Sequence, residues 1–404
     1  MRVATSTLYT QGLASMNNQQ ASLLHVQQQL GTGRRVLSPS DDPVAASRAL
    51  GVSLAGAVNN QYATSRKQAN STLGLEENTL QTVTTTIQNI KTLLVNAGNG
   101  TMSDNDRASL ATALQGQYDQ LLGLANADDG NGNYLFAGLQ SGTVPFTKNA
   151  AGGAVYQGDT GNQLLQVDVA RQMQAGNNGA EVFQSVTANA GYVLQAGNNT
   201  GTATYSAISA SDPTDPLYGH SFTLSFANVA GVTQYTVTDN TTGNPVVAGV
   251  PYADGVNIDV GGVSFSVKGA PAAGDIMTIK PAQQAGTDMF ANLQNVIDAL
   301  KQPLNTDADN AKLQNVIATG IRQFNNSLDN VLTVRSSVGS RMNELDSLDA
   351  IGTNRDLGNQ KTLSDLTELD YAAAISEYYQ RSTALQGAQS SFMQIQGMNL
   401  FRFL

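Results

Sequence analysis

Each end of the chain contains a long stretch without a single charged side chain, and these two stretches most restrict what the chain can fold into. The 31 residues from Val3 to Gly33 contain no Asp, Glu, Lys or Arg, and neither do the 20 residues from Ser382 to Phe401. A solvent-exposed helix usually carries Lys and Glu on its outer face. A helix formed by either stretch is therefore expected to be enclosed by other protein.

Apolar residues recur at coiled-coil spacing in both terminal segments, at intervals of three, four and seven residues. Polar residues occupy several intervening seam positions, so each apolar stripe is thin. We predict that these apolar residues form the main seam between subunits of an assembly. They are Leu13, Met16, Leu23 and Leu30 near the N-terminus, and Tyr371, Ile375, Tyr378, Leu385 and Phe392 near the C-terminus.

A stripe this thin is too weak to order a terminal segment by itself. Four or five buried anchors contribute about 1.5–3 kcal/mol each. Ordering some 30 residues costs about 1–2 kcal/mol per residue in backbone entropy alone. We therefore expect each arm to be disordered in the free monomer and helical only when packed against the other arm and neighbouring subunits.

Stronger heptads lie inside the arms, with intervals that alternate between four and three. We also expect a helix that begins after Ser103, with Asp106 completing the cap, and another that ends before Pro303. The heptad residues are Ala69, Leu73, Glu76, Leu80, Val83, Ile87, Ile90 and Leu94, then Ile317, Ile321, Phe324, Leu328, Val331, Arg335, Val338, Met342 and Leu345.

The middle of the chain changes to the two-residue period of half-buried strands. Strands are predicted around Phe222–Phe226, Val256–Val260 and Val263–Val267, with a smaller β patch at Tyr134–Gly138 and Leu165–Val169. The predicted fold class is α+β, with a long coiled-coil-like helical rod from both chain ends, a small β-hairpin region and a central all-β insertion. The predicted segments are an N-terminal arm (1–45), a helical rod with the hairpin (46–190), an outward-facing β insertion (191–283), the second half of the rod (284–361) and a C-terminal arm (362–404) that pairs with the first.

Composition excludes several classes of function. The chain has 21 Lys and Arg against 31 Asp and Glu, a net charge of −10, which argues against nucleic acid as a partner. With no Cys and only two His, zinc sites, iron–sulfur clusters and thiol nucleophiles are excluded, and no cofactor is expected. No apolar run is long enough to insert into a membrane, and the N-terminus lacks the apolar core of a cleaved secretory signal.

No catalytic constellation is evident. His25 fits a seam or surface position, and His220 lies in a turn before a strand. The segment from Asp128 to Gly132 resembles a cation loop but lacks the calcium-loop spacing, so a turn is favoured. Asp42 fits a helix N-cap followed by Pro43 in the first turn better than a catalytic carboxylate. We therefore expect a protein that is not an enzyme.

Several segments resemble the flagellin superfamily of bacterial flagellar axial proteins, and within it the hook-associated subunits. They are Leu30–Ser47, which contains PSDDP, then Asn99–Leu114, Asn133–Phe146, Tyr156–Asp159 and Leu369–Leu404. No family signature is found in the central β region, residues 191–283.

The resemblance implies an extracellular adaptor that joins hook to filament and templates flagellin assembly. It implies a ring of identical subunits, contact with a neighbouring hook-associated protein and with flagellin, and type III export without a cleaved signal. Residues from Met1 to about Gln20 would carry the export signal, and an export chaperone would bind the C-terminal arm. Because aromatic and aliphatic anchors suit a helical groove, we assign Tyr378, Leu385 and Phe392 to the chaperone contact.

Three alternatives remain open from the sequence. A flagellin that forms the whole filament is the nearest, and self-polymerisation into long filaments would distinguish it. A secreted adhesin would need an aromatic groove in the β insertion, where most aromatic residues instead alternate as core positions. An enzyme in the β insertion is the third alternative; His220 is the only His of this region, and the sequence does not place a catalytic pair of carboxylates there.

Overall fold

The computed structural model describes residues 5–100, 102–149 and 152–397. The start of the expected export segment (1–4) and the end of the C-terminal arm (398–404) lie outside this range. The helices are α1 Thr5–Thr32, α2 Pro43–Ala97, α3 Asp104–Ala125, α4 Gly179–Phe183, α5 Met289–Lys301, α6 Asp307–Thr367 and α7 Tyr371–Gly397, with a 3₁₀ turn η1 at Ala282–Gln284. The strands are β1 Phe146–Lys148, β2 Ala154–Tyr156, β3 Leu164–Asp168, β4 Arg171–Gln174, β5 Tyr192–Ala196, β6 Thr204–Tyr205, β7 Ser209–Ala210, β8 Phe222–Val229, β9 Val232–Asp239, β10 Pro245–Pro251, β11 Val256–Val260, β12 Val263–Lys268 and β13 Ile276–Pro281.

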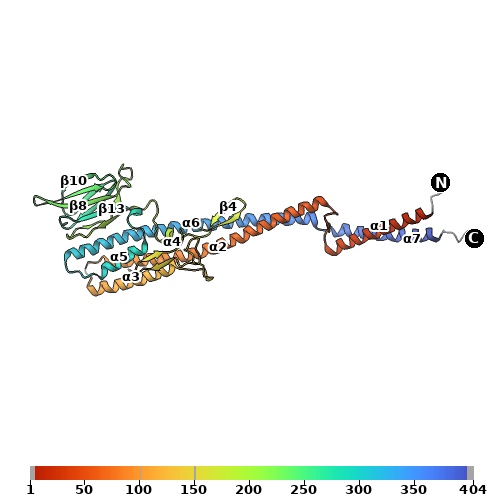
Figure 1. The fold of residues 1–404 in the computed structure, drawn as a ribbon, viewed down its shortest axis with the longest axis horizontal. Coiled ribbons are helices and arrows are strands. Elements are labelled where there is room, and N and C mark those ends of the chain that lie inside the picture. The colour runs from red at the N-terminus through yellow and green to blue at the C-terminus, as the bar shows by residue number, and fades with distance from the viewer. Residues whose placement is uncertain (1–4, 101, 150–151, 398–404) are drawn as a thin grey trace, which may run out of the picture. The chain divides into compact units, whose positions relative to one another are not determined.

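The chain divides into two compact units, which we describe separately. The terminal unit comprises residues 1–64 with 347–404, and the central unit comprises residues 65–346. Helices α2 and α6 contribute residues to both units. The predicted fold class is confirmed, because long helices from both chain ends flank a central β-rich region (Figure 1).

In the central unit α2 and α6 run antiparallel, and the predicted heptads form their shared core. Arg335 on α6 donates to the Glu77 carboxylate on α2 at 2.5 and 3.0 Å. A Cβ added at Gly320 on α6 would lie 3.9 Å from Leu94 on α2. The largest heptad side chains are fully covered. They include Leu73, Leu80, Val83, Ile87, Ile90 and Leu94 on α2 and Phe324, Val331 and Val338 on α6.

The predicted helix-start signals are confirmed. Ser103 forms a capping box with Asp106 at the start of α3, because each side chain bonds to the other residue's backbone N–H. The Oδ1 atom of Asp42 accepts the Ala45 N–H at 2.9 Å, and Pro43 is the first residue of α2. Helix α5 ends at Lys301, before Pro303, as expected.

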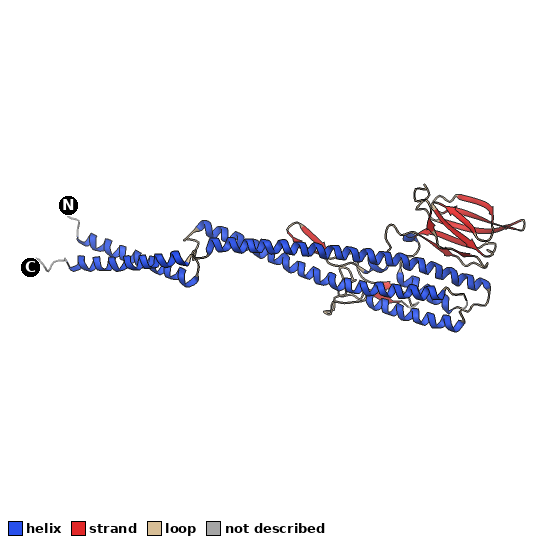
Figure 2. Cartoon of the chain, turned by 180° about the vertical axis from the view of Figure 1, so that it is seen from behind, coloured by secondary structure: helices blue, strands red, loops and turns tan. Residues whose placement is uncertain are grey.

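The central β region consists of two antiparallel sheets with one core between them (Figure 2). The five-stranded sheet has the order β10-β9-β8-β13-β5, and β12 of the second sheet pairs with β11, β6 and β7. Alternate residues of β8 and β12 point into the core, which confirms the predicted period of two. Phe222, Phe226 and Phe265 are among the largest fully buried side chains.

Polar side chains on α6 hold this β region against the helix. Asn315 donates to the carbonyl of Ala203 at 2.9 Å, and Thr319 donates to the carbonyl of Leu194 at 2.8 Å. The Tyr205 hydroxyl bonds with Thr319 Oγ1 at 2.5 Å, and the residue is half-buried. Burial raises the pKa of Tyr205 to about 12, so this phenol remains protonated.

The predicted strand at Tyr134–Gly138 is wrong. Only Tyr134 forms a β-bridge, with Asp128, and the chain then turns through Gly138, which has φ of +67°. The backbone of this segment does not form a continuous β-ladder. The Leu135 N–H donates to the Ala127 carbonyl, and the Phe136 carbonyl accepts from the Gly179 N–H. The turn places Phe136 in an aromatic cluster with Phe146, Phe183 and Phe290, whose neighbouring ring centroids lie 5.0–5.9 Å apart.

Candidate functional site: the paired terminal helices

The two terminal helices, α1 and α7, lie side by side in the terminal unit (Figure 1). Near their free ends the ring centroids of Tyr9 and Phe392 are 5.1 Å apart. Gly12 makes room for Phe392, because a Cβ at this position would lie only 3.3 Å from the ring. The two charge-free segments therefore meet along an aromatic and small-residue contact.

Six of the nine predicted seam residues are half-buried within the chain, and three are exposed. The half-buried residues are Met16, Leu23, Leu30, Tyr378, Leu385 and Phe392. The exposed residues are Leu13, Tyr371 and Ile375. The contact between α1 and α7 within one chain therefore covers only part of the predicted stripe.

The structure identifies two seam residues that the sequence interpretation missed. Val26 on α1 and Ala374 on α7 are the buried side chains of these helices, among those that the structure describes. The covered stripe of α1 follows Gly12, Met16, Gln19, Leu23, Val26 and Leu30. This is an unbroken sequence of four- and three-residue steps, and reading Gly12 and Gln19 as seam positions would have revealed it.

A hydrogen-bonded corner joins α1 to α2 and α6 to α7 in the terminal unit. Arg34 and Glu368 form a β-bridge, flanked by bonds from Arg35 N to Thr367 O and from Leu369 N to Gly33 O. Gly33 has φ of +69°, and a Cβ there would lie 2.9 Å from the Tyr371 hydroxyl. The two chain connections are therefore fixed to each other at the base of both arms.

Two aspartates carry the electrostatics of this corner. The pKa of each carboxyl is lowered mainly by a hydrogen bond from a backbone N–H. The donor is Ser38 for Asp41 and Ala45 for Asp42. His25 lies 3.2 Å from Asp41, and Arg35 lies 3.1 Å from Asp42. Both aspartates are thus engaged in shaping the loop and capping α2, as the sequence suggested for Asp42.

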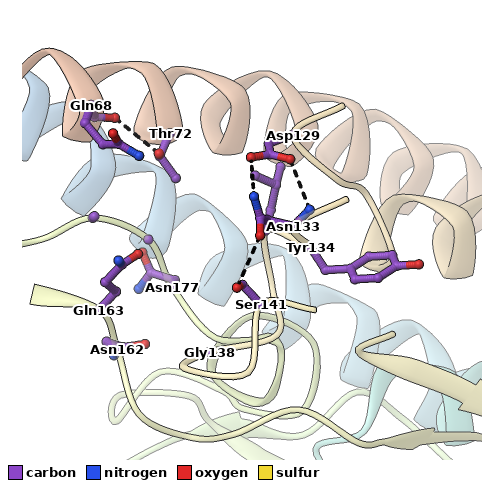
Figure 3. Close-up of a pocket in the computed structure, with 13 residues that line it drawn as sticks. Gln68, Thr72, Asp129, Asn133, Tyr134, Gly138, Ser141, Asn162, Gln163 and Asn177 are labelled. Carbon is purple, nitrogen blue, oxygen red and sulfur yellow. Dashed lines mark hydrogen bonds between the residues drawn. The ribbon is translucent and has the colours of Figure 1, made fainter. Parts of the chain in front are cut away.

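The polar hollow in the central unit shows no catalytic arrangement among its described residues (Figure 3). It holds about 200 Å³ and is lined mainly by amides, hydroxyls and backbone. Its carboxylate, Asp129, accepts bonds from the Asn133 side chain and from the Asn131 and Asn133 backbone, which lower its pKa to about 2. Asp129 therefore closes a turn, which is the structure that the sequence favoured for this segment.

The remaining titratable groups of note are also structural. Asp239 is buried and accepts bonds from His220 Nδ1 at 2.9 Å and from Thr241 and Thr242, which hold its pKa at about 2 despite burial.

Within residues 5–100, 102–149 and 152–397, no group of three or more His, Cys, Asp or Glu is placed to hold a metal ion. None of the described helices is long and apolar enough to cross a bilayer.

Glu76 is the one heptad residue whose charge conflicts with its surroundings. It is 1% exposed, its Oε2 accepts the Asn177 N–H at 3.2 Å, and its Oε1 has no hydrogen-bond partner among the described residues. Burial raises its pKa to about 8, against the opposing effect of Arg341. The carboxyl is therefore largely protonated at neutral pH.

Comparison with known proteins agrees with this arrangement. The profile of the bacterial flagellin N-terminal helical region matches residues 3–141. Two solved structures have a similar fold. The flagellar junction protein FlgL of Legionella pneumophila is 27% identical with a TM-score of 0.67, and covers 80% of this chain and all of its own. FlgL of Xanthomonas campestris is 26% identical with a TM-score of 0.67, and covers 78% of this chain and 99% of its own. The fold and the paired terminal helices thus define a flagellin-like protein.

Two curated relatives match along the full length. Flagellar hook-associated protein 3 of Escherichia coli K12 is 35% identical over 403 residues, which cover 100% of this chain and 99% of the relative. The same protein of Salmonella typhimurium is 36% identical over the same coverage. The chain belongs to the flagellar hook-associated protein 3 family.

Proposed function

We propose that this chain is a structural adaptor subunit that joins the hook of the bacterial flagellum to the filament and templates flagellin assembly. The observation that carries the proposal is the pair of terminal helices, which meet through charge-free segments and whose apolar side chains stay partly uncovered within one chain. Sequence identity of 35–36% to hook-associated protein 3 along the full length supports the same role. The chain acts by binding, and catalysis has no part in the proposal.

Copies of the chain would form a ring by heterologous contacts, each using a different surface from the one it meets. The nine seam residues would contribute on both sides of these contacts. Leu13, Tyr371 and Ile375 are exposed in the single chain, so they are available to neighbours. One end of the ring would meet a neighbouring hook-associated protein, and the other would meet flagellin.

The arms would be ordered only inside this assembly. A helix pair that buries Val26 and Ala374 as its fully covered side chains gains little hydrophobic free energy against the backbone entropy of two long helices. Packing among copies would cover the remaining apolar residues and supply the missing free energy.

Deletion of the chain from its bacterium tests the junction role. Electron microscopy should show hooks without filaments, with flagellin released into the medium, and a plasmid copy should restore filaments. Filaments that still grow from hooks without the chain would contradict the adaptor role. Long filaments formed by the purified chain alone would favour a flagellin instead.

We further propose that the chain leaves the cell through the flagellar type III apparatus without a cleaved signal, and that an export chaperone holds the C-terminal arm before export. Tyr378, Leu385 and Phe392 share one face of α7, as an anchor set for a helical groove requires.

Calorimetry with the bacterium's own flagellar chaperone tests this contact. Tyr378, Leu385 and Phe392 replaced together by Ser should weaken binding strongly. Tyr379→Ser is the matched control, because this ring lies on the exposed side of α7. Equal affinity of the triple variant and the unmodified chain would rule out the assigned anchors.

A further inference from the structure

Helix α2 carries an apolar row on its outward side in the terminal unit, apart from the predicted seam. Leu50, Leu54 and Val58 are 63%, 60% and 44% exposed and follow one another at steps of four residues. They therefore form one ridge, about 12 Å long at 1.5 Å per residue. Residues on this side of a coiled-coil helix are usually charged, because water is their neighbour.

The part of α2 in the central unit has no such apolar row on its outward side. Farther along α2, in the central unit, the exposed residues include Thr82, Thr85 and Asn89, and the heptad core beneath them is fully packed. The apolar row is thus confined to the terminal unit, and it is not a general property of α2. Arg48 is the only charged residue between Pro43 and Ser65.

A matching row lies on α7. Tyr371, Ile375 and Tyr379 are 53%, 45% and 67% exposed and also follow steps of four. Glu377 and Arg381, the two charged residues of α7, bond to each other beside this row. Both rows are uncharged, apolar and equal in length, and i±4 ridges of two helices interlock at a crossing angle of about 50°.

We propose that the α2 row of one copy, Leu50, Leu54 and Val58, receives the α7 row of a second copy, Tyr371, Ile375 and Tyr379. This contact rests on the proposed assembly of copies and specifies one of its surfaces. An uncharged apolar ridge excludes a charged partner, since burying an unpaired charge is costly. The exposed α7 row meets that requirement and is present on every subunit.

Disulfide cross-linking tests the contact directly, because the chain has no Cys of its own. Leu54→Cys and Ile375→Cys chains are expressed together in the bacterium that lacks its own copy, and intact flagella are oxidised. A disulfide needs Cβ atoms about 4 Å apart, so a mixed dimer reports close approach. The matched control pairs Thr82→Cys with Ile375→Cys, since Thr82 is exposed on the same helix outside the row.

We expect a mixed dimer with Cys at position 54 and none with Cys at position 82. If filaments grow on the hooks but no disulfide joins position 54 of one chain to position 375 of another, the contact is overturned and the junction role is kept. The same holds if the only disulfides join position 54 of one chain to position 54 of another. Failure of the unmodified chain to restore filaments would instead overturn the proposed function, and this contact with it.

A charge substitution gives an independent test. Leu54→Asp should abolish filament attachment, whereas Thr82→Asp should leave it unchanged. Circular dichroism of both purified monomers should match the unmodified chain, because each side chain is exposed. Filaments that form normally with Leu54→Asp would overturn the proposal.

Discussion

The central and terminal units use the same heptad periodicity with opposite results. In the central unit Leu80, Ile87 and Ile90 are completely covered, and four phenylalanine rings pack together beside α5. In the terminal unit α1 and α7 bury Val26 and Ala374, while Leu13 and Ile375 stay exposed. A heptad stripe therefore completes a core within one chain only where it is dense in large apolar residues. A thin stripe leaves surface for other copies.

The two units also handle charge differently. The central helices join through Glu77 and Arg335, and Glu76 lies near Arg341 inside the core. The arms carry no charge over most of their length. Desolvating the arms between copies would therefore cost little electrostatic free energy.

Truncation of an aromatic ring should lower the free energy of unfolding far more in the central unit than in the terminal unit. Phe290→Ala removes a fully buried ring and should lower the free energy of unfolding by about 3–5 kcal/mol. Phe392→Ala should change it by less than about 0.5 kcal/mol in the dilute monomer, because exposed or thinly packed sites have small effects. Urea unfolding followed by circular dichroism measures both. Equal losses would remove the distinction between the units.

The pH dependence of the central unit should trace to Glu76. Its pKa is raised from 4.5 to about 8 in the folded chain, so the folded state binds more protons between these values. Stability should therefore fall as the pH rises through this window, by at most about 1.4 kcal/mol per pH unit.

Glu76→Gln should flatten this slope and make the chain more stable than the unmodified protein near pH 8. Glu77→Gln serves as the neighbouring control. It removes only the smallest of the causes that raise the pKa of Glu76, so most of the slope should remain. Urea unfolding at several pH values between 4.5 and 8 measures this slope. An unchanged slope in Glu76→Gln would mean that another group causes the pH dependence.

The smallest effect is expected at the corner of the terminal unit. Asp42→Ala removes the cap of α2 and should cost about 1 kcal/mol locally. Amide exchange of the first turn of α2 should become several-fold faster, whereas Ser47→Ala should have no such effect. Unchanged exchange in Asp42→Ala would mean that the cap contributes nothing there.

Much of the fold could be predicted because its signals are local. Ser103 with Asp106, Asp42 with Pro43, and the alternation in β8 each depend on neighbours in sequence. The turn at Tyr134–Gly138 could not be predicted, because its backbone partners, such as Gly179, come from distant segments.

The candidate site was predicted in part for the same reason. Heptad spacing identified Met16, Leu23 and Leu385. It passed over Val26, because the seven-residue step from Leu23 to Leu30 skips this position, and over Gly12 and Ala374, because their side chains are small or absent. Their role depends on what lies across the seam, which one helix's spacing does not encode. The outward row of Leu50, Leu54 and Val58 became visible only once exposure was known.

Hydrogen exchange of the dilute monomer and of intact flagella tests whether the terminal helices need neighbouring copies in order to fold. In the monomer, peptides from α1 and α7 should exchange rapidly, while residues 73–94 of α2 stay protected; in flagella, all three should be protected. If the terminal helices of the solitary chain exchanged as slowly as residues 73–94, they would fold without neighbours, and assembly would not be what orders the arms.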